Sequence, residues 1–217
     1  MPVTEWFPAP GLAAYRDGVT MVCELAAQFG HQAWDAATPC ADWRAADLAG
    51  HLRCVADDFN EYLDDAPASR MARLMATGAH PDTLGRKLAR QNAAELAALP
   101  DRPAPEHIEA FAESARGYAR RLTTVWELPH HRYRDTVVTV GGMAGAACVE
   151  WHLHAWDLGR ALGKEYRPAG PEIVLAGGRA GVPQLQLGAD FGTDDPWLVL
   201  LRASGRSPYG AHEASLR

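Results

Sequence analysis

The sequence predicts a mainly α-helical protein, organised as a four-helix bundle with a short irregular C-terminal appendage. Several substantial segments repeat apolar residues at steps of three and four, the period of an amphipathic helix. Short links join these segments, which favours neighbouring antiparallel helices in a bundle. The 217 residues suffice for one hydrophobic core and are too few for two ordinary domains. We therefore expect a bundle over residues 1–165 and an appendage over residues 166–217 that packs on it.

The first two helices are predicted over residues 11–29 and 44–65. Gly30 ends the first of them, because glycine commonly follows the last helical turn. Between the two helices, Thr38–Pro39 requires an extended or turn geometry, since the residue before proline avoids the helical region. The inward stripe of the second helix consists of Leu48, Leu52, Val55, Phe59 and Tyr62. His51 lies at the edge of this stripe.

Residues 83–99 carry the weakest helical pattern, and a proline-rich sequence ends it. Pro105 suits the first turn of a long helix that continues to about residue 125. His130 and His131 follow that helix, and we expect them at a helix end, where cationic side chains interact favourably with the helix dipole.

The sequence HRYRDTVVTVGG, residues 131–142, is β-prone and predicts an extended linker or a short strand. The last long helix is predicted over about residues 143–162, with Gly163 as its end. Beyond it, the many glycines and prolines predict only a short or irregular helix. Asp194 or Asp195 is expected to cap a last short helix.

Composition and charge exclude several classes of function. The net charge of -6, without a basic stripe, disfavours nucleic acid and anionic membranes as partners. No apolar run approaches the ~18 residues of a membrane span, and the first residues do not resemble a signal peptide. The cysteines form no Cys-x-x-Cys pair, so neither a disulfide framework nor a thiolate zinc site is expected. We expect a cytoplasmic protein with small-molecule ligands, and a homodimer is compatible with the sequence.

The last long helix carries a carboxylate and an imidazole on its apolar face. Glu150 and His154 fall on the same stripe as Trp151 and Leu158. A lone carboxylate buried there would cost several kcal/mol unless it were paired or coordinated. Side chains at positions i and i+4 have Cβ atoms about 5–6 Å apart, so these two can reach one cation. His51, from the second helix, is the best-placed third ligand.

Two histidines and one carboxylate leave coordination positions open for water or substrate, as in catalytic zinc sites. The same donor set suits non-haem iron, so the ligand types alone do not choose the metal. Zinc is the first expectation, with iron or nickel as alternatives. From spacing alone, a solvated or hydrogen-bonded pair of Glu150 and His154 is the competing interpretation. His152, two residues from either, points elsewhere.

Three residues of the second helix are weighed as pocket residues, and none is assigned as catalytic. Cys54 lies one turn from His51, although a small buried hydrophobe is the favoured interpretation. Asp58 and Tyr62 lie on the His51 side of the helix and are expected to face the cavity. Cys40, in the Thr-Pro-Cys turn, is more typical of a structural residue than of a nucleophile.

Two residues of the C-terminal half complete the candidates. Asp157, three residues after His154, could hold a ligand histidine, with a capping or solvent role as the alternative. Arg206 could bind an anionic substrate, and the alternative that we favour is a surface arginine in a mobile tail.

Two motifs resemble the DinB-like superfamily, in particular its mycothiol-dependent maleylpyruvate isomerase branch. The first is WDAATPCADWRAADLAGHL, residues 34–52, with Trp, Thr-Pro-Cys, a second Trp, Asp-Leu and His-Leu. The second is VEWHLHAWDLGRALG, residues 149–163, with Glu, three residues, His, one residue and Trp-Asp-Leu. With the helix order, the resemblance covers about residues 11–165.

The resemblance implies a DinB-like four-helix bundle that binds a divalent metal, usually zinc. By position, the family's ligands correspond to His51, Glu150 and His154. The resemblance further implies that mycothiol, a low-molecular-weight thiol, is the co-substrate and that the metal supplies it as a thiolate nucleophile. In the superfamily's S-transferases the thiol stays attached to an electrophile. In its isomerases the thiol adds to a double bond, the bond rotates and the thiol leaves.

We therefore expect a metal-dependent enzyme that activates a mycothiol-type thiol for S-transfer to, or exchange on, a small electrophilic substrate. Cis–trans isomerisation of a maleylpyruvate-like diacid is the first alternative, and it should require basic residues in the pocket, for which the sequence has no clear cluster. A metal-binding or partner-binding helical module without catalysis is the second alternative. The tail is shorter than the C-terminal domain of the isomerases proper, so substrate determinants from that domain are not transferred.

Overall fold

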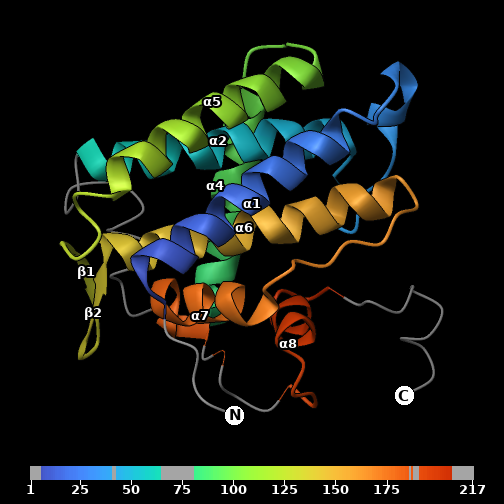
Figure 1. Cartoon of the computed structure of the whole chain (residues 1–217). Helices are drawn as coiled ribbons and strands as arrows, with labels where there is room; N and C mark the ends of the chain where they lie inside the picture. Colours follow the sequence, from blue (N-terminus) through green and yellow to red (C-terminus); the bar gives the residue numbers. More distant parts are fainter. Residues whose placement is uncertain (1–5, 41–42, 65–80, 186, 188–190, 207–217) are drawn as a thin grey trace.

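The computed structural model describes residues 6–40, 43–64, 81–185, 187 and 191–206, and these residues are mainly helical. The α-helices are α1 (Pro8–Ala26), α2 (Ala45–Asp64), α4 (Pro81–Ala98), α5 (Ala104–Leu122), α6 (Val140–Ala161), α7 (Pro171–Gly181) and α8 (Pro196–Ala203). Two antiparallel strands, β1 (Pro129–Tyr133) and β2 (Thr136–Thr139), precede α6 (Figure 1). The predicted mainly α-helical class is confirmed.

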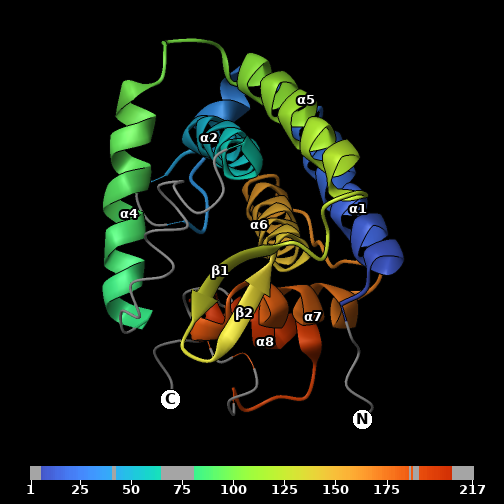
Figure 2. The same cartoon turned by 90° about the vertical axis from the view of Figure 1, so that its left-hand side faces the viewer.

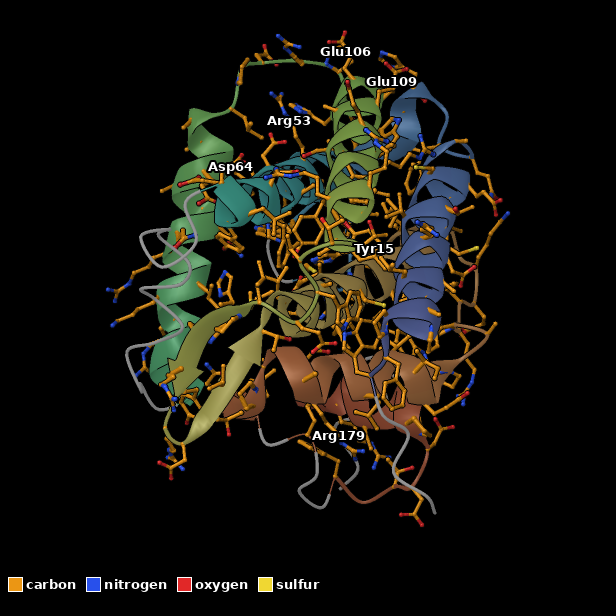
Figure 3. All side chains as sticks on the ribbon, turned by 60° about the vertical axis from the view of Figure 1, so that its left-hand side comes forward. Tyr15, Arg53, Asp64, Glu106, Glu109 and Arg179 are labelled. Carbon is orange, nitrogen blue, oxygen red and sulfur yellow. The ribbon has the colours of Figure 1, made fainter. Side chains whose placement is uncertain are left out.

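Helices α1, α2, α5 and α6 form the bundle, in which α2 packs on α5 and α1 packs on α6 (Figures 1 and 2). Trp151 of α6 lies at its centre, with ring centroids 5.0 Å from Phe111, 6.0 Å from Tyr15 and 6.1 Å from Phe59. Figure 3 shows Tyr15 directed from α1 into the bundle, whereas Glu109 lies at the periphery. One aromatic cluster therefore joins all four helices.

Helix α4 stands beside the bundle, and its main contact in the described part of the chain is with α2 (Figure 2). The two helices approach closely at Gly50. A Cβ atom there would lie 3.0 Å from Cδ1 of Leu99 and 3.1 Å from Cδ2 of Leu96. The segment with the weakest helical pattern is thus the one that the bundle core does not include.

Helix α7 has 11 residues, which agrees with the prediction of a short or irregular helix, and its geometry is regular. Its glycines allow a close approach to α6. A Cβ atom at Gly145 would lie 2.3 Å from the carbonyl oxygen of Gly177, and one at Gly181 would lie 2.3 Å from that of Gly142. We call these four residues the glycine seam. α7 and α8 also contact each other, and the division of the chain at residue 165 stays a prediction.

The ends of two helices follow the predicted local signals. Gly163 has a φ of 68°, and the chain turns there just after α6. At α8, Oδ1 of Asp195 accepts hydrogen bonds from the N–H groups of Trp197 and Leu198. None of the helices in the described segments has the combination of length and apolar character needed to span a membrane.

His130 and His131 lie in strand β1, so the prediction that places them at a helix end was wrong. Strand side chains normally alternate between faces. Here the β1–β2 register shifts between Pro129 and His131, and this bulge leaves both imidazoles buried. Their Nδ1 atoms lie 2.9 Å apart. Burial lowers the pKa of both rings, and the pKa of His131 falls to about 4.

Substitution of Gly145 by alanine should destabilise the protein by about 1–3 kcal/mol, because a methyl group in the glycine seam must push α6 and α7 apart. Urea unfolding followed by circular dichroism measures this change. Gly85, an exposed residue of α4 with no described atom within 4 Å of an added Cβ, is the matched control. Gly85→Ala should stabilise the protein by about 0.5–1 kcal/mol. Equal effects of the two substitutions would contradict the role of the glycine seam in packing α6 on α7.

The lowered pKa of His131 makes a prediction about acid stability. The unfolded chain, with a histidine pKa near 6.5, binds this proton more readily than the folded chain. The contribution of His131 to the free energy of unfolding is therefore complete above pH 6.5 and declines as the pH falls toward 4. His131→Gln should lose less stability between pH 7 and pH 4.5 than the wild type, measured by urea unfolding. The exposed His31, changed to Gln, is the control and should leave the decline unchanged.

Candidate metal centre

Helix α6 is buried along most of its length and carries buried polar side chains on neighbouring turns. His152 and Asp157 are 0% exposed and His154 is 4% exposed. Buried polar groups require hydrogen-bond partners. His152 places Nε2 3.0 Å from the carbonyl oxygen of Ala14 and Nδ1 2.5 Å from the hydroxyl of Tyr166. It therefore ties α6 to α1 and points away from the candidate site, as predicted.

His51 of α2 and Glu150 and His154 of α6 come together across the bundle. One donor atom from each lies within 4.8 Å of the others. Nε2 of His154 is 3.2 Å from Oε2 of Glu150. The contact lacks the angles of a hydrogen bond, and Nε2 of His154 and Nδ1 of His51 are buried without a hydrogen-bond partner among the described residues. Ligands of a tetrahedral zinc, about 2.0–2.2 Å from the ion, lie roughly 3.3 Å apart, so the donor set fits a shared divalent cation.

Glu150 is less buried than the stripe pattern predicts. Its side chain is 43% exposed, against 6% for that of His154. The carboxylate therefore lies at the solvent-facing margin of the group, whereas both imidazoles are inside. The burial cost used in the sequence argument is correspondingly smaller, and the group is open to solvent on the Glu150 side.

His154 also belongs to a second group, with Cys40 and Asp157. Its Nδ1 lies 2.8 Å from Oδ2 of Asp157, and the Cys40 thiol lies 3.2 Å from the same oxygen. An ionised carboxylate only accepts hydrogen bonds, so Nδ1 carries the proton. A metal-bound histidine typically donates its other ring N–H in this way, which leaves Nε2 for the metal. The second group is thus a support for His154, and the first group is the one suited to a cation.

Arg206 reaches Asp157 from the segment after α8. Its Nε lies 2.9 Å from Oδ1 and its Nη2 lies 2.6 Å from Oδ2. The Arg206 side chain is 13% exposed. The favoured interpretation of an exposed surface arginine was wrong, because a buried carboxylate engages the guanidinium of Arg206. A role of Arg206 in binding an anionic substrate stays a prediction.

Comparison with protein families places this site in context. The family model of the mycothiol maleylpyruvate isomerase N-terminal domain matches residues 15–159. The chain belongs to this family. No protein in a search of curated proteins and no solved structure matches the chain significantly. The matched range contains His51, Glu150, His154 and Asp157, and it does not contain Arg206. Membership in the isomerase family links the chain to mycothiol-related chemistry.

The charges of the site favour a bound cation. Burial, reinforced by the neighbouring His154, lowers the pKa of His51 to about 3, so its imidazole is neutral. Burial also opposes charge on His154, but contacts with Asp157, Cys40 and Glu150 raise its pKa well above the ordinary value. The hydrogen bonds from Arg206 and His154 outweigh burial and hold the pKa of Asp157 low. Two carboxylates therefore flank His154, and positive charge is stabilised between them.

Cys40 and Trp43 contact the site, and the sequence argument did not assign them there. The Thr38 hydroxyl accepts a hydrogen bond from the Cys40 N–H and donates one to the Trp43 carbonyl, which fixes the turn before α2. The ring centroid of Trp43 then lies 4.7 Å from that of His51. The Thr-Pro-Cys and Trp positions of the isomerase-family motif were the available signal, and their use becomes visible only when the turn is folded.

The remaining candidates on α2 lie elsewhere. Cys54 is half-buried, and burial, with the Glu95 carboxylate next, raises its pKa to about 11. Neither donor group includes Cys54 or Asp58. Tyr62 is buried about three turns along α2 from His51, with its ring centroid 5.7 Å from that of His130. Of the five additional candidates, Asp157 contacts the candidate ligand His154, and Arg206 contacts Asp157.

Protein purified without added metal should contain about one divalent ion per chain, because the three donors fit one cation. His51→Ala and His154→Ala should each lose this ion, as measured by elemental analysis. His31→Ala, at an exposed histidine outside the group, should keep it. Full occupancy in both site variants would show that the cation binds elsewhere.

Proposed function

We propose that this protein is a metal-dependent enzyme that activates a mycothiol-type thiol for S-transfer to, or exchange on, a small electrophilic substrate. The observation that carries the proposal is the group of His51, Glu150 and His154, with two buried imidazole nitrogens that lack a partner among the described residues. This group lies inside the range matched by the isomerase family, which supports the thiol as co-substrate. Zinc suits these ligands best, and iron and nickel remain alternatives.

The residues of the site each have a role in this chemistry. A divalent cation held there lowers the pKa of a coordinated thiol and so supplies a thiolate near neutral pH. His51 provides a neutral nitrogen donor, His154 would provide a second one when the cation takes the place of its Nε2 proton, and Glu150 provides a negative oxygen donor. Trp43 covers the His51 ring, and Asp157 fixes the His154 ring. Solvent and substrate approach from the side of Glu150, whose side chain is the exposed member of the group.

Cis–trans isomerisation of a maleylpyruvate-like diacid is the second candidate, supported by the family name alone. A dianionic substrate would require cationic side chains facing the open side of the site. The cationic residue considered for that role, Arg206, donates from Nε and Nη2 to Asp157. This engagement favours S-transfer over the isomerase reaction.

A metal-binding module without catalysis is the third candidate. Such a structural site would be closed by a fourth protein ligand. In the described part of the chain, the group of His51, Glu150 and His154 includes no fourth His, Cys, Asp or Glu. Open coordination positions favour an enzyme.

The test is to incubate zinc-loaded protein with mycothiol and a panel of electrophiles and to identify adducts by mass spectrometry. We expect a thioether or exchange product that forms faster than without protein, and His154→Ala should abolish the acceleration. Glutathione in place of mycothiol tests the choice of thiol. His31→Ala is the control for loss of an unrelated histidine.

Two outcomes would redirect the proposal. Conversion of maleylpyruvate to its trans isomer, with mycothiol unchanged and no adduct, would establish the isomerase alternative. Tight metal binding without adduct or isomerisation would establish the non-catalytic module.

A further inference from the structure

Arg206 and Asp157 form a buried, two-pronged ion pair beside the candidate metal centre. Arg206 uses Nε and Nη2, so both carboxylate oxygens are held. The Asp157 side chain is 0% exposed and that of Arg206 is 13% exposed. A planar guanidinium that binds a carboxylate through two parallel hydrogen bonds fixes its orientation as well as its charge. Asp157 therefore has a defined direction in the interior of the protein.

That direction determines which nitrogen of His154 faces the site. Oδ2 of Asp157 accepts from Nδ1 of His154 at 2.8 Å and from the Cys40 thiol at 3.2 Å. With Nδ1 held by Asp157, Nε2 is the ring nitrogen left for a cation, and this atom lies beside Glu150. Without Arg206, the buried carboxylate would lose the two hydrogen bonds that orient it, and its side chain would be free to rotate. That rotation would release the imidazole.

The backbone places Arg206 through a helix C-cap. At the end of α8, Gly205 has a φ of 75°. The N–H of Gly205 donates to the Arg202 carbonyl, and the N–H of Arg206 donates to the Leu201 carbonyl at 2.7 Å. This is the Schellman pattern, in which a left-handed glycine turns the chain back across the helix end. The position of Arg206 is thus set by α8 and not by Asp157 alone.

We propose that Arg206 is a positioning residue of the metal centre, which acts through Asp157 to hold His154 with Nε2 toward the cation. The inference rests on the proposed metal site and adds to it a residue outside the family range of 15–159. It assigns the segment after α8 a function in the site: this segment completes the chain of contacts from Arg206 to Asp157 to His154.

The test compares zinc affinity, by competition with a chelator, in wild type and Arg206→Lys. Lysine keeps the charge and loses the two-pronged geometry. We expect affinity to fall about 10- to 100-fold, the usual effect of removing a partner of a ligand histidine. The matched control is Arg167→Lys, because Arg167 forms the same two-pronged pair with the more exposed Asp195. The control should change affinity less than about twofold.

Asp157→Asn tests whether Arg206 acts on the zinc site through Asp157. If Arg206 acts through Asp157, the variant with both Asp157→Asn and Arg206→Lys should bind zinc as Asp157→Asn does alone. If the two substitutions instead lower zinc affinity by independent factors that multiply in the double variant, the proposed action through Asp157 is overturned. Unchanged affinity in Arg206→Lys would overturn the proposal.

A second variant and a second measurement keep the proposal testable if Arg206→Lys does not fold correctly. Gly205→Ala keeps every side chain of the pair and strains the backbone that places Arg206, and we expect it to weaken zinc binding. Gly163→Ala imposes similar strain at the end of α6 and is its control. The Nδ1–H signal of His154 in NMR spectra should be protected from exchange in wild type and less protected in both Arg206→Lys and Gly205→Ala.

The NMR readout also separates the two proposals, because it needs no metal. If wild-type protein binds no zinc but shows the protected Nδ1–H, the proposed function fails and the arrangement of Arg206, Asp157 and His154 stands. If zinc binds and protection is the same in wild type and Arg206→Lys, the metal site stands and the role of Arg206 fails.

Discussion

Burial of α6 is the constraint on which the rest of the structure depends. The helix carries His152, His154 and Asp157 into the interior, and buried polar groups require hydrogen-bond partners. The partners from outside α6 come from α1, from the turn before α2, and from segments that follow α6 and α8. The bundle is therefore assembled around polar requirements as well as around the aromatic cluster of Trp151.

The two histidines of this helix show how partners decide a role. His152 uses both ring nitrogens, one toward the Ala14 carbonyl and one toward Tyr166, and no donor atom is left for a ligand. His154 uses Nδ1 toward Asp157 and keeps Nε2 beside Glu150. The same residue type, two positions apart, is a structural tie in one case and a candidate ligand in the other.

Sequence reasoning reached those features that depend on local pattern. Helical periodicity predicted the bundle helices, and the i, i+4 spacing brought Glu150 and His154 to one group. His51 followed from the inner edge of its helix and from the family motif. Sequence reasoning could not place Arg206, because its contact with Asp157 joins residues 49 positions apart and leaves no periodic trace. The burial of His130 depends on a β-bulge, which the sequence pattern does not reveal. The glycines of α7 allow close packing on α6, and composition alone does not distinguish glycines that serve packing from glycines that make a segment flexible.

The glycine seam has a consequence for motion. Side chains between two helices can change rotamer and let the helices slide, but at the seam backbone meets backbone. α6 and α7 should therefore move as one rigid unit, with the candidate ligands Glu150 and His154 fixed on it. Helix α4, in contrast, has its main described contact with α2, through side chains, so local opening should cost less at α4 than at α7. The glycine seam thus directs local opening of the protein away from α7 and toward α4.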